Sequence, residues 1–252
     1  MRSQAEVVGI IPARYASTRL PGKALAELCG KPMIQHVYEQ ASRASSLGEV
    51  WVATDSSQIV DAVEAFGGRA VMTSADHRTG TDRLAEVAAS LDATELIVNI
   101  QGDEPLIDPN AIDAVVQPLL ASGECQMSSA MTVLAANEAL DPNVVKVVTD
   151  PDGVALYFSR AAIPATRSDP PEPGRFRKHL GLYAYRKSFL LELSRLEPTP
   201  LERCEALEQL RALENGHRIQ MVELSSDESI SVDTPEDLER VRAIMVRREA
   251  IN

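Results

Sequence analysis

The chain has 252 residues, 44% of them hydrophobic, so it can bury a large core in one domain. Its net charge of −12 argues against nucleic acid and anionic membranes as partners, although a local pocket can still be positive and bind a small anion. Three scattered cysteines, Cys29, Cys125 and Cys204, show no metal-ligand spacing and predict reduced thiols in a cytoplasmic protein. No segment resembles a signal peptide or is apolar enough for membrane insertion, so neither is expected.

The first predicted strand covers residues 7–11, an apolar, β-branched run that Pro12 should end because proline cannot donate to a sheet ladder. Ligands of open α/β sheets bind beyond the carboxyl ends of strands, where the next loop emerges. This loop predicts a polyphosphate site through its cations, its hydroxyls and a glycine that permits close backbone approach: Arg14, Arg19, Lys23, Ser17, Thr18 and Gly22. It is not a Walker P-loop, because Ala24 follows the lysine. A solvated basic loop is the alternative interpretation.

Strands and helices alternate through the first half of the chain. Further strands are expected at 50–53 and 70–72, and another buried strand at 96–100. Helices are expected between them, and another should begin at Pro109, with Asp108 as N-cap. This rhythm predicts an α/β fold with a mostly parallel, doubly wound sheet in a single domain, 1–252.

The middle of the chain changes character. Strand-like runs follow one another without helices at 127–133, 144–148, 154–158 and 180–185, and the turn residues 150–153 predict a hairpin. We expect an inserted antiparallel lobe at about 126–190. The proline-rich stretch 168–174 should be a mobile loop.

The last part of the chain predicts two helices and a strand. A capping box, Thr199 to Glu202, should open a helix whose apolar side chains share one face and which Gly216 closes: Leu201, Cys204, Leu207, Leu210 and Leu213. A strand and then a basic C-terminal helix, entered through residues 233–237, should end the chain.

Two carboxylates are candidates for a divalent metal. Asp103 follows the core strand 96–100, where it could hold Mg²⁺ against substrate phosphates; a simple Gly-Asp turn is the alternative. Asp233 precedes Thr234, which can itself cap the helix ahead of Pro235. Asp233 is therefore available as a second ligand, with helix entry as its alternative role.

Several other polar residues suit ligand binding less specifically. Arg83 lies in a first helical turn, where its charge opposes the macrodipole, so its guanidinium could serve a base carbonyl. His179 and Tyr183 share a strand face, although core packing explains such tyrosines more simply. Glu208 and Gln209 lie off the leucine stripe, where a solvated face is the default.

Together these segments resemble the bacterial 3-deoxy-manno-octulosonate (KDO) cytidylyltransferase family, also called CMP-KDO synthetases. The run 11–23 is similar to the family's opening signature. The resemblance covers nearly the whole chain through further motifs at 80–83, 99–105, 144–146, 157–160, 179–183, 207–211 and 232–238. The stretch 165–175 departs from the family pattern, so loop contacts there are not expected to carry over.

The resemblance implies a glycosyltransferase-A-like nucleotidyltransferase fold, a homodimer, and a step of lipopolysaccharide biosynthesis. In this reaction CTP and KDO give CMP-KDO and pyrophosphate, by in-line attack of the sugar hydroxyl on the α-phosphorus. By motif, the nucleotide-binding residues are Ala13, Arg14, Arg19, Lys23, Arg83 and Gln101. Lys23, Arg14 and Asp103 are implied to be catalytic, and Asp103 and Asp233 to bind Mg²⁺. The implied sugar pocket consists of Arg160, His179, Tyr183, Glu208 and Gln209.

Two other functions remain open at this point. A related cytidylyltransferase could act on another acidic sugar, such as 8-amino KDO or sialic acid, because pocket shape decides the acceptor. A non-catalytic CTP sensor belongs to a different class and would be expected to lack a carboxylate or a cation. Asp103, Asp233, Arg14 and Lys23 are all present in this chain.

Overall fold

The structure is a computed structural model that describes residues 6–16, 19–77, 79–165, 167, 174–225 and 229–249. It divides into two compact units. The first unit is Met1–Asp113 with Glu228–Asn252, and the second is Ala114–Asp227. Ser17, Thr18 and most of the predicted mobile loop, 168–173, lie outside the described residues. No described helix combines the length and apolar character that crossing a membrane requires.

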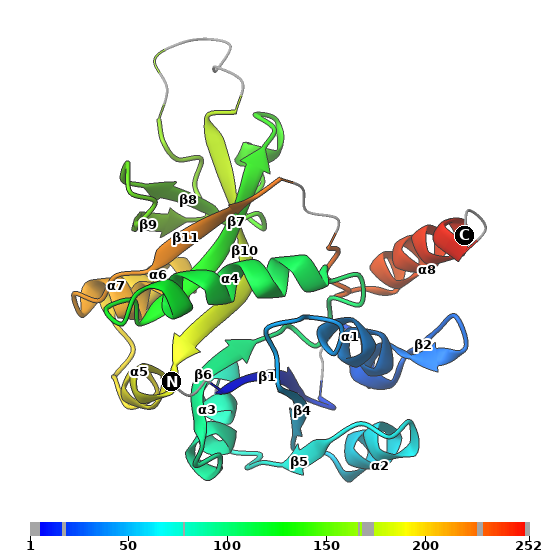
Figure 1. Ribbon diagram of the computed structural model, residues 1–252. Coiled ribbons are helices and arrows are strands. Elements are labelled where there is room, and N and C mark those ends of the chain that lie inside the picture. Colours follow the sequence, from blue (N-terminus) through cyan, green and yellow to red (C-terminus); the bar gives the residue numbers. More distant parts are fainter. Residues whose placement is uncertain are drawn as a thin grey trace. The chain divides into compact units, whose positions relative to one another are not determined.

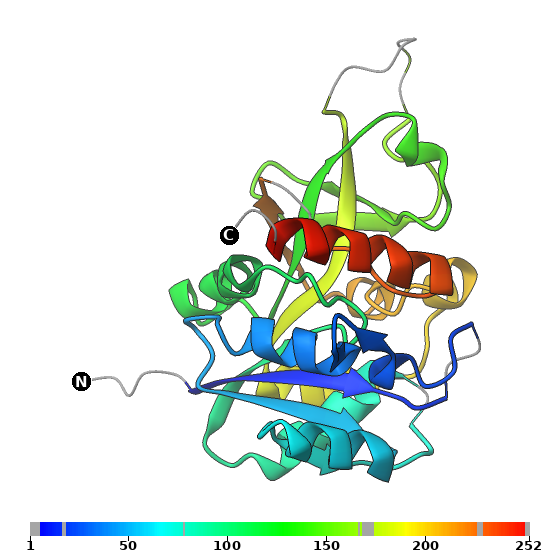
Figure 2. The same cartoon turned by 90° about the vertical axis from the view of Figure 1, so that its right-hand side faces the viewer.

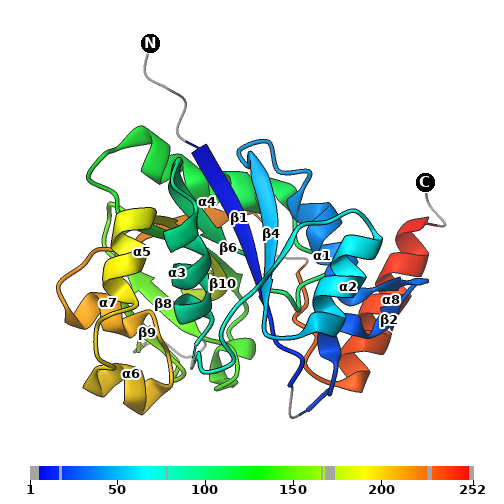
Figure 3. The same ribbon diagram turned by 90° about the horizontal axis from the view of Figure 1, so that it is seen from below.

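The first unit is built on four parallel strands in the order β6-β1-β4-β5. Figure 3 shows α1 and α2 on one side of these strands and α3 on the other, which confirms the predicted doubly wound sheet. The elements of this unit are β1 (Glu6–Ala13), η1 (Lys23–Leu25), β2 (Glu27–Leu28), β3 (Lys31–Pro32), α1 (Met33–Ala41), β4 (Glu49–Thr54), α2 (Ser57–Ala65), β5 (Ala70–Met72), α3 (Gly80–Ser90), β6 (Thr94–Asn99) and α8 (Pro235–Glu249). Helix α4 (Pro109–Ala121) begins in this unit and continues into the second.

The strand order reverses between β1 and β6. From β1 the chain moves outward to β4 and β5, and it then returns to place β6 on the free side of β1. Figure 2 shows β1 and β4 running side by side. In open α/β sheets, such a reversal leaves a crevice beyond the carboxyl ends of the two diverging strands. The loops that follow Ala13 and Asn99 therefore lie where this rule places the binding crevice of the unit.

Pro12 does not end the first strand, so that expectation was wrong. The strand β1 continues through Pro12 to Ala13, and both residues still pair with β4. The backbone of Ile10 faces β6, where its carbonyl accepts from Ile100, and Pro12 faces the same way two residues later. The strand β6 has already ended there, so Pro12 lies on an edge that needs no donor.

The second unit contains an antiparallel arrangement. Figure 1 shows β7 and β10 side by side, with β11 next to β7 and the pair β8–β9 beside them. The predicted hairpin is confirmed, because β8 and β9 pair antiparallel across the turn at 150–153. The elements are β7 (Met127–Leu134), η2 (Glu138–Leu140), β8 (Lys146–Thr149), β9 (Ala155–Ser159), β10 (Phe176–Arg186), α5 (Lys187–Leu193), α6 (Pro200–Glu205), α7 (Leu210–Glu214) and β11 (Gln220–Leu224).

The single helix expected from Thr199 to Gly216 is two short helices, α6 and α7. Ala206 ends α6 with a left-handed backbone, at φ 51°. The apolar residues recur only in steps of three, and each such step turns by about 60° around a helix of 3.6 residues per turn. They therefore cannot share one face, and Leu201 is 40% exposed whereas Leu210 is fully buried.

We predict that Ala206→Gly stabilises the protein. A non-glycine residue in the left-handed region costs about 1 kcal/mol, and glycine relieves this at some cost in chain entropy. The free energy of unfolding in urea should rise by about 0.5 kcal/mol. The matched change Ala212→Gly, inside α7, should instead lower it by about 1 kcal/mol. A lower free energy of unfolding in Ala206→Gly would contradict the claim that the backbone at Ala206 is strained.

Candidate active site

The cationic loop after β1 folds back on itself. Gly22 has a left-handed φ of 67°, and its backbone N–H donates to the Tyr15 carbonyl at 3.2 Å. The left-handed backbone therefore requires a glycine at position 22. The sequence suggested a different reason, namely that a glycine lets the backbone come close to a ligand. Arg14 is exposed and donates to the carbonyl of His77 at 2.7 Å, so its side chain reaches the loop that follows β5.

Lys23 lies between two carboxylates from distant parts of the chain. Its ammonium donates to Asp103 Oδ2 at 2.6 Å and to Asp233 Oδ1 at 3.1 Å. Arg19 forms an ion pair with the other oxygen of Asp233, at 3.0 Å. The structure therefore brings together four of the predicted site residues at the crevice beyond β1 and β6.

Three local features place the two carboxylates. A Cβ on Gly102 would lie 2.8 Å from the Pro12 carbonyl oxygen, so only glycine lets the loop after β6 approach β1 this closely. The backbone N–H of Val232 donates to the Asp103 carbonyl at 2.8 Å, which holds the segment carrying Asp233 beside that loop. The N-terminus of α8 is capped by Thr234 and Asp237, as expected for Thr234, so Asp233 does not serve as the cap.

The charges at this crevice keep Lys23 protonated. Burial alone would lower the pKa of Lys23, but attraction to Asp103 and Asp233 outweighs it and raises the pKa above its usual value. Among the described residues, no group of three or more His, Cys, Asp or Glu side chains could hold a metal. A metal bound here would have the two aspartates as its acidic ligands and would complete its shell with water or substrate oxygens.

Arg83 is fully buried near this part of the first unit. Its guanidinium forms an ion pair with Asp55 at 2.8 Å and donates to the Thr73 hydroxyl. The Nε atom is buried and has no hydrogen-bond partner among the described residues. Ala13 ends β1 and Gln101 follows β6, so both border the crevice. Contact of any of these residues with a nucleotide stays a prediction.

The predicted sugar residues lie in the second unit, and two of them, Tyr183 and Gln209, contact the ring of a third, His179. Its Nε2 lies 2.9 Å from the Ser129 hydroxyl, and Gln209 donates to its Nδ1 at 3.5 Å. The ring also contacts Phe158 and Tyr183, with centroids 4.8 and 5.4 Å away. Gln209 is 5% exposed, so the solvated-face alternative is wrong for it. Glu208, next to it, forms an ion pair with Arg211 at 3.6 Å.

Arg160, the fifth sugar candidate, is held mainly by backbone carbonyls. Its Nε donates to the Glu205 carbonyl at 2.7 Å, and its terminal nitrogens donate to Pro142 at 3.0 Å and Ala206 at 3.3 Å. A guanidinium has five N–H donors, so one remains on each terminal nitrogen.

Comparison with known proteins places the chain. Residues 8–219 match a family described as cytidylyltransferase. A 3-deoxy-manno-octulosonate cytidylyltransferase of Geobacter metallireducens is 56% identical, over 94% of this chain and 96% of its own length. The one of Solibacter usitatus is 54% identical, over 94% and 93%. The chain belongs to the KDO cytidylyltransferase family. It is therefore a nucleotidyltransferase, and the sensor alternative is not favoured.

Solved structures agree with this membership. A CMP:2-keto-3-deoxy-manno-octonic acid synthetase complexed with CTP has a TM-score of 0.92 and 44% identity, covering 97% of this chain and all of the other. The 4-diphosphocytidyl-2C-methyl-D-erythritol synthase of Anaerococcus prevotii is only 17% identical, with a TM-score of 0.63 and coverage of 96% and 99%. At this low identity, the second structure supports a shared fold and no shared function.

The sequence missed several residues that hold this family's motifs in place. Asp55 follows β4 just as Asp103 follows β6, so the strand-end rule that singled out Asp103 would also have found it. Gly102 was noted only as part of a turn, and its close approach to β1 has no sequence signal. Glu205 and Lys146 act on backbone groups of the second unit. Lys146 belongs to the motif 144–146, in which it has no predicted role, and Glu205 lies outside every motif.

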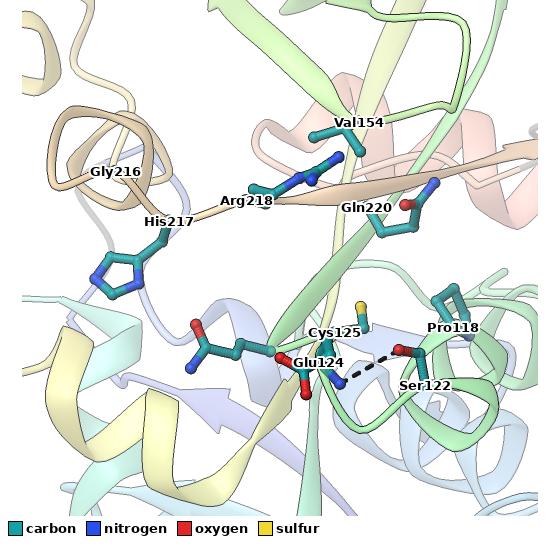
Figure 4. Close-up of a pocket in the computed structure, with 10 residues that line it drawn as sticks. Pro118, Ser122, Glu124, Cys125, Val154, Gly216, His217, Arg218 and Gln220 are labelled. Atoms are coloured by element: carbon teal, nitrogen blue, oxygen red, sulfur yellow. Dashed lines mark hydrogen bonds between the residues drawn. The ribbon is translucent and has the colours of Figure 1, made fainter.

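A separate pocket of about 580 Å³ lies in the second unit, between the end of α4 and the segment before β11 (Figure 4). Cys125, His217 and Arg218 line it, and none of the predicted site residues does. All three cysteines of the chain are free thiols, and burial raises the pKa of the Cys125 thiol. This pocket therefore plays no part in the site described above.

We predict that Gly102→Ala displaces Asp103. The new Cβ would also lie 3.3 Å from Ile11, and the Pro12 carbonyl is backbone, so the loop itself must move. Turnover should fall at least tenfold, and the free energy of unfolding by about 1–3 kcal/mol. Pyrophosphate release and urea denaturation measure the two effects. Gly123→Ala, where a Cβ meets nothing within 4 Å, is the control that should leave both unchanged.

We also predict that His179 makes the protein sensitive to acid. Burial lowers the pKa of His179 from 6.5 to about 3. Between these values the unfolded chain binds a proton that the folded chain does not, so stability falls as the pH falls. From pH 7 to pH 5 the wild type should lose about 2 kcal/mol more unfolding free energy than His179→Asn. Urea titrations at the two pH values test this, and parallel losses in both proteins contradict it.

Proposed function

We propose that this chain transfers CMP from CTP to KDO, releasing pyrophosphate, with Mg²⁺ held by Asp103 and Asp233. The observation that carries the proposal is the shared contact of Lys23 with both carboxylates, at the crevice beyond β1 and β6. Family membership adds support, because the named relatives use this nucleotide and this sugar. The acceptor residues all lie in the second unit and the nucleotide residues in the first.

The nucleotide is bound by cations in this proposal. Arg14, Arg19 and Lys23 contact the triphosphate, Ala13 borders it through its backbone, and Gln101 and Arg83 recognise the cytidine. The buried Nε of Arg83, which has no described partner, supports its role toward a base carbonyl. No side-chain nucleophile is needed, because positioning and charge neutralisation supply most of the rate. Lys23 and Arg19 stabilise the charge that develops on the departing pyrophosphate.

The residues present fit Mg²⁺. The donor set is two carboxylates, and a cation, the Lys23 ammonium, already contacts an oxygen of each. Magnesium takes one or two carboxylates and completes its shell with water and phosphate oxygens. When bound, it polarises the α-phosphoryl oxygen and lowers the pKa of a coordinated hydroxyl. Lys23 is then free to donate its ammonium hydrogens to phosphate oxygens instead.

The acceptor residues suit an acidic, hydroxyl-rich sugar. Arg160 keeps one N–H on each terminal nitrogen, a pair that can bind the carboxylate of KDO. His179 is neutral at physiological pH, and burial together with Glu208 raises the pKa of Tyr183, so its phenol keeps its proton. Glu208 supplies an acceptor for sugar hydroxyls.

A homodimer in the cytoplasm, serving lipopolysaccharide assembly, completes the proposal. Exposed apolar side chains on the second unit support an interface there: Val133, Leu140 and Leu156, exposed by 51%, 78% and 61%. Three free thiols are consistent with a reducing compartment. A monomeric mass in sedimentation equilibrium would refute the dimer.

The proposal is tested with purified protein, CTP, Mg²⁺ and a panel of KDO, 8-amino KDO and sialic acid. Pyrophosphate release should be fastest with KDO, and ³¹P NMR should show the sugar phosphodiester of CMP. Preference for another sugar would reassign the acceptor. CTP binding without turnover on any sugar would overturn the enzymatic function of this chain.

We predict that Asp103→Asn lowers turnover by at least a hundredfold while the fold survives. The amide removes a negative charge from the metal site, and metal-bound charge stabilisation is worth several kcal/mol. The control is Asp108→Asn, on the same chain segment, because asparagine caps a helix as well as aspartate does. Turnover of Asp103→Asn near the wild-type rate at saturating Mg²⁺ would refute the metal role.

A further inference from the structure

Lys146 is a fully buried lysine in β8, and no carboxylate of the described residues lies within hydrogen-bond distance of its ammonium. Its ammonium donates to three backbone carbonyls: Asp141 at 2.9 Å, Val144 at 2.6 Å and Arg160 at 2.5 Å. An ammonium has three N–H donors, so all of them are used. Lys146 therefore cannot bind a substrate itself, and its charge serves to hold two separate backbone segments together.

Glu205 plays the matching role from the end of α6. Its carboxylate accepts from the Ser159 hydroxyl at 2.6 Å and from the backbone N–H of Arg160 at 2.9 Å. In return, the Arg160 side chain donates to the carbonyls of Glu205 and Ala206, which a helix end otherwise leaves without partners. Arg160 is thus fixed through its backbone and its side chain, at the left-handed break after α6.

The same contacts lead directly to the other acceptor residues. The carbonyl of Val145, beside Lys146, accepts from the backbone N–H of His179 at 2.9 Å. The break at Ala206 turns the chain so that Glu208 and Gln209 precede α7, with Gln209 donating to the His179 ring. Each residue of the predicted sugar set except Tyr183 is therefore placed by a backbone segment that Lys146 or Glu205 holds.

We infer that Lys146 and Glu205 are positioning residues for the acceptor sugar, which set the orientation of Arg160 and of the Glu208–Gln209 turn without touching the substrate. This inference rests on the proposed function. Recognition of the acceptor sugar then depends on the hydrogen bonds of Lys146 and Glu205 to backbone groups of the second unit. Removing either charge should change how the sugar is bound and leave CTP binding unchanged, because the nucleotide residues lie in the other unit.

The test uses Glu205→Gln and Lys146→Met in the full chain. In Glu205→Gln the side chain keeps an acceptor for Ser159 but turns an amide N–H₂ toward the Arg160 N–H. The KM for KDO should rise at least tenfold, while the KM for CTP stays within twofold and the urea midpoint stays close to that of the wild type. Lys146→Met should show the same split in KM. The control is Glu192→Gln, an exposed carboxylate on α5, which should leave both KM values unchanged.

Each outcome is decisive. An unchanged KM for KDO in Glu205→Gln overturns the inference, and so does an equal rise in both KM values, which indicates general loosening of the fold. If Lys146→Met fails to fold, the Glu205→Gln result decides alone. Absence of pyrophosphate release by the wild type with CTP and KDO refutes the proposed function, a result distinct from failure of the inference.

Discussion

The contact of one ammonium with two carboxylates organises the candidate site of the first unit. Asp103 and Asp233 are 130 positions apart in the sequence, and like charges brought this close repel each other unless a cation lies between them. Lys23 supplies that cation, and Arg19 adds a second on Asp233. The arrangement already gathers the two carboxylates that we propose as ligands of a divalent metal.

The fold makes this contact possible through the reversal of strand order at β1. The loops after β1 and β6 emerge side by side there, and Gly102 allows them to come within contact distance. One backbone hydrogen bond, from Val232 to Asp103, then holds the C-terminal segment against the same loop. In the second unit, two cationic side chains are held by backbone carbonyls instead of carboxylates. Arg160 and the buried Lys146 donate to main-chain oxygens and so hold the segments that carry the proposed acceptor residues.

Features of the fold that depend on local patterns could be predicted from the sequence. The alternation of strands and helices, the hairpin at 150–153 and the capping of α8 by Thr234 all follow from neighbouring residues, and the structure has them. The sequence also indicates Asp103 and Asp233 as candidates, each from its own neighbouring residues. Features that depend on distant partners could not be predicted. Pro12 is tolerated only because β6 ends early, and the buried ion pair of Arg83 with Asp55 joins segments whose contact no local pattern reveals. The helix break at Ala206 was predictable in part. The three-residue spacing of the apolar residues argues against one continuous helical face, but it does not say where the helix breaks.

The most direct test is a crystal structure of the chain with CTP and Mn²⁺ in place of Mg²⁺, since manganese scatters anomalously and accepts the same oxygen ligands. We expect an anomalous peak in contact with carboxylate oxygens of both Asp103 and Asp233, with the Lys23 ammonium moved onto a phosphate oxygen. Manganese bound to the phosphates alone, with Lys23 still bridging the two aspartates, would contradict it.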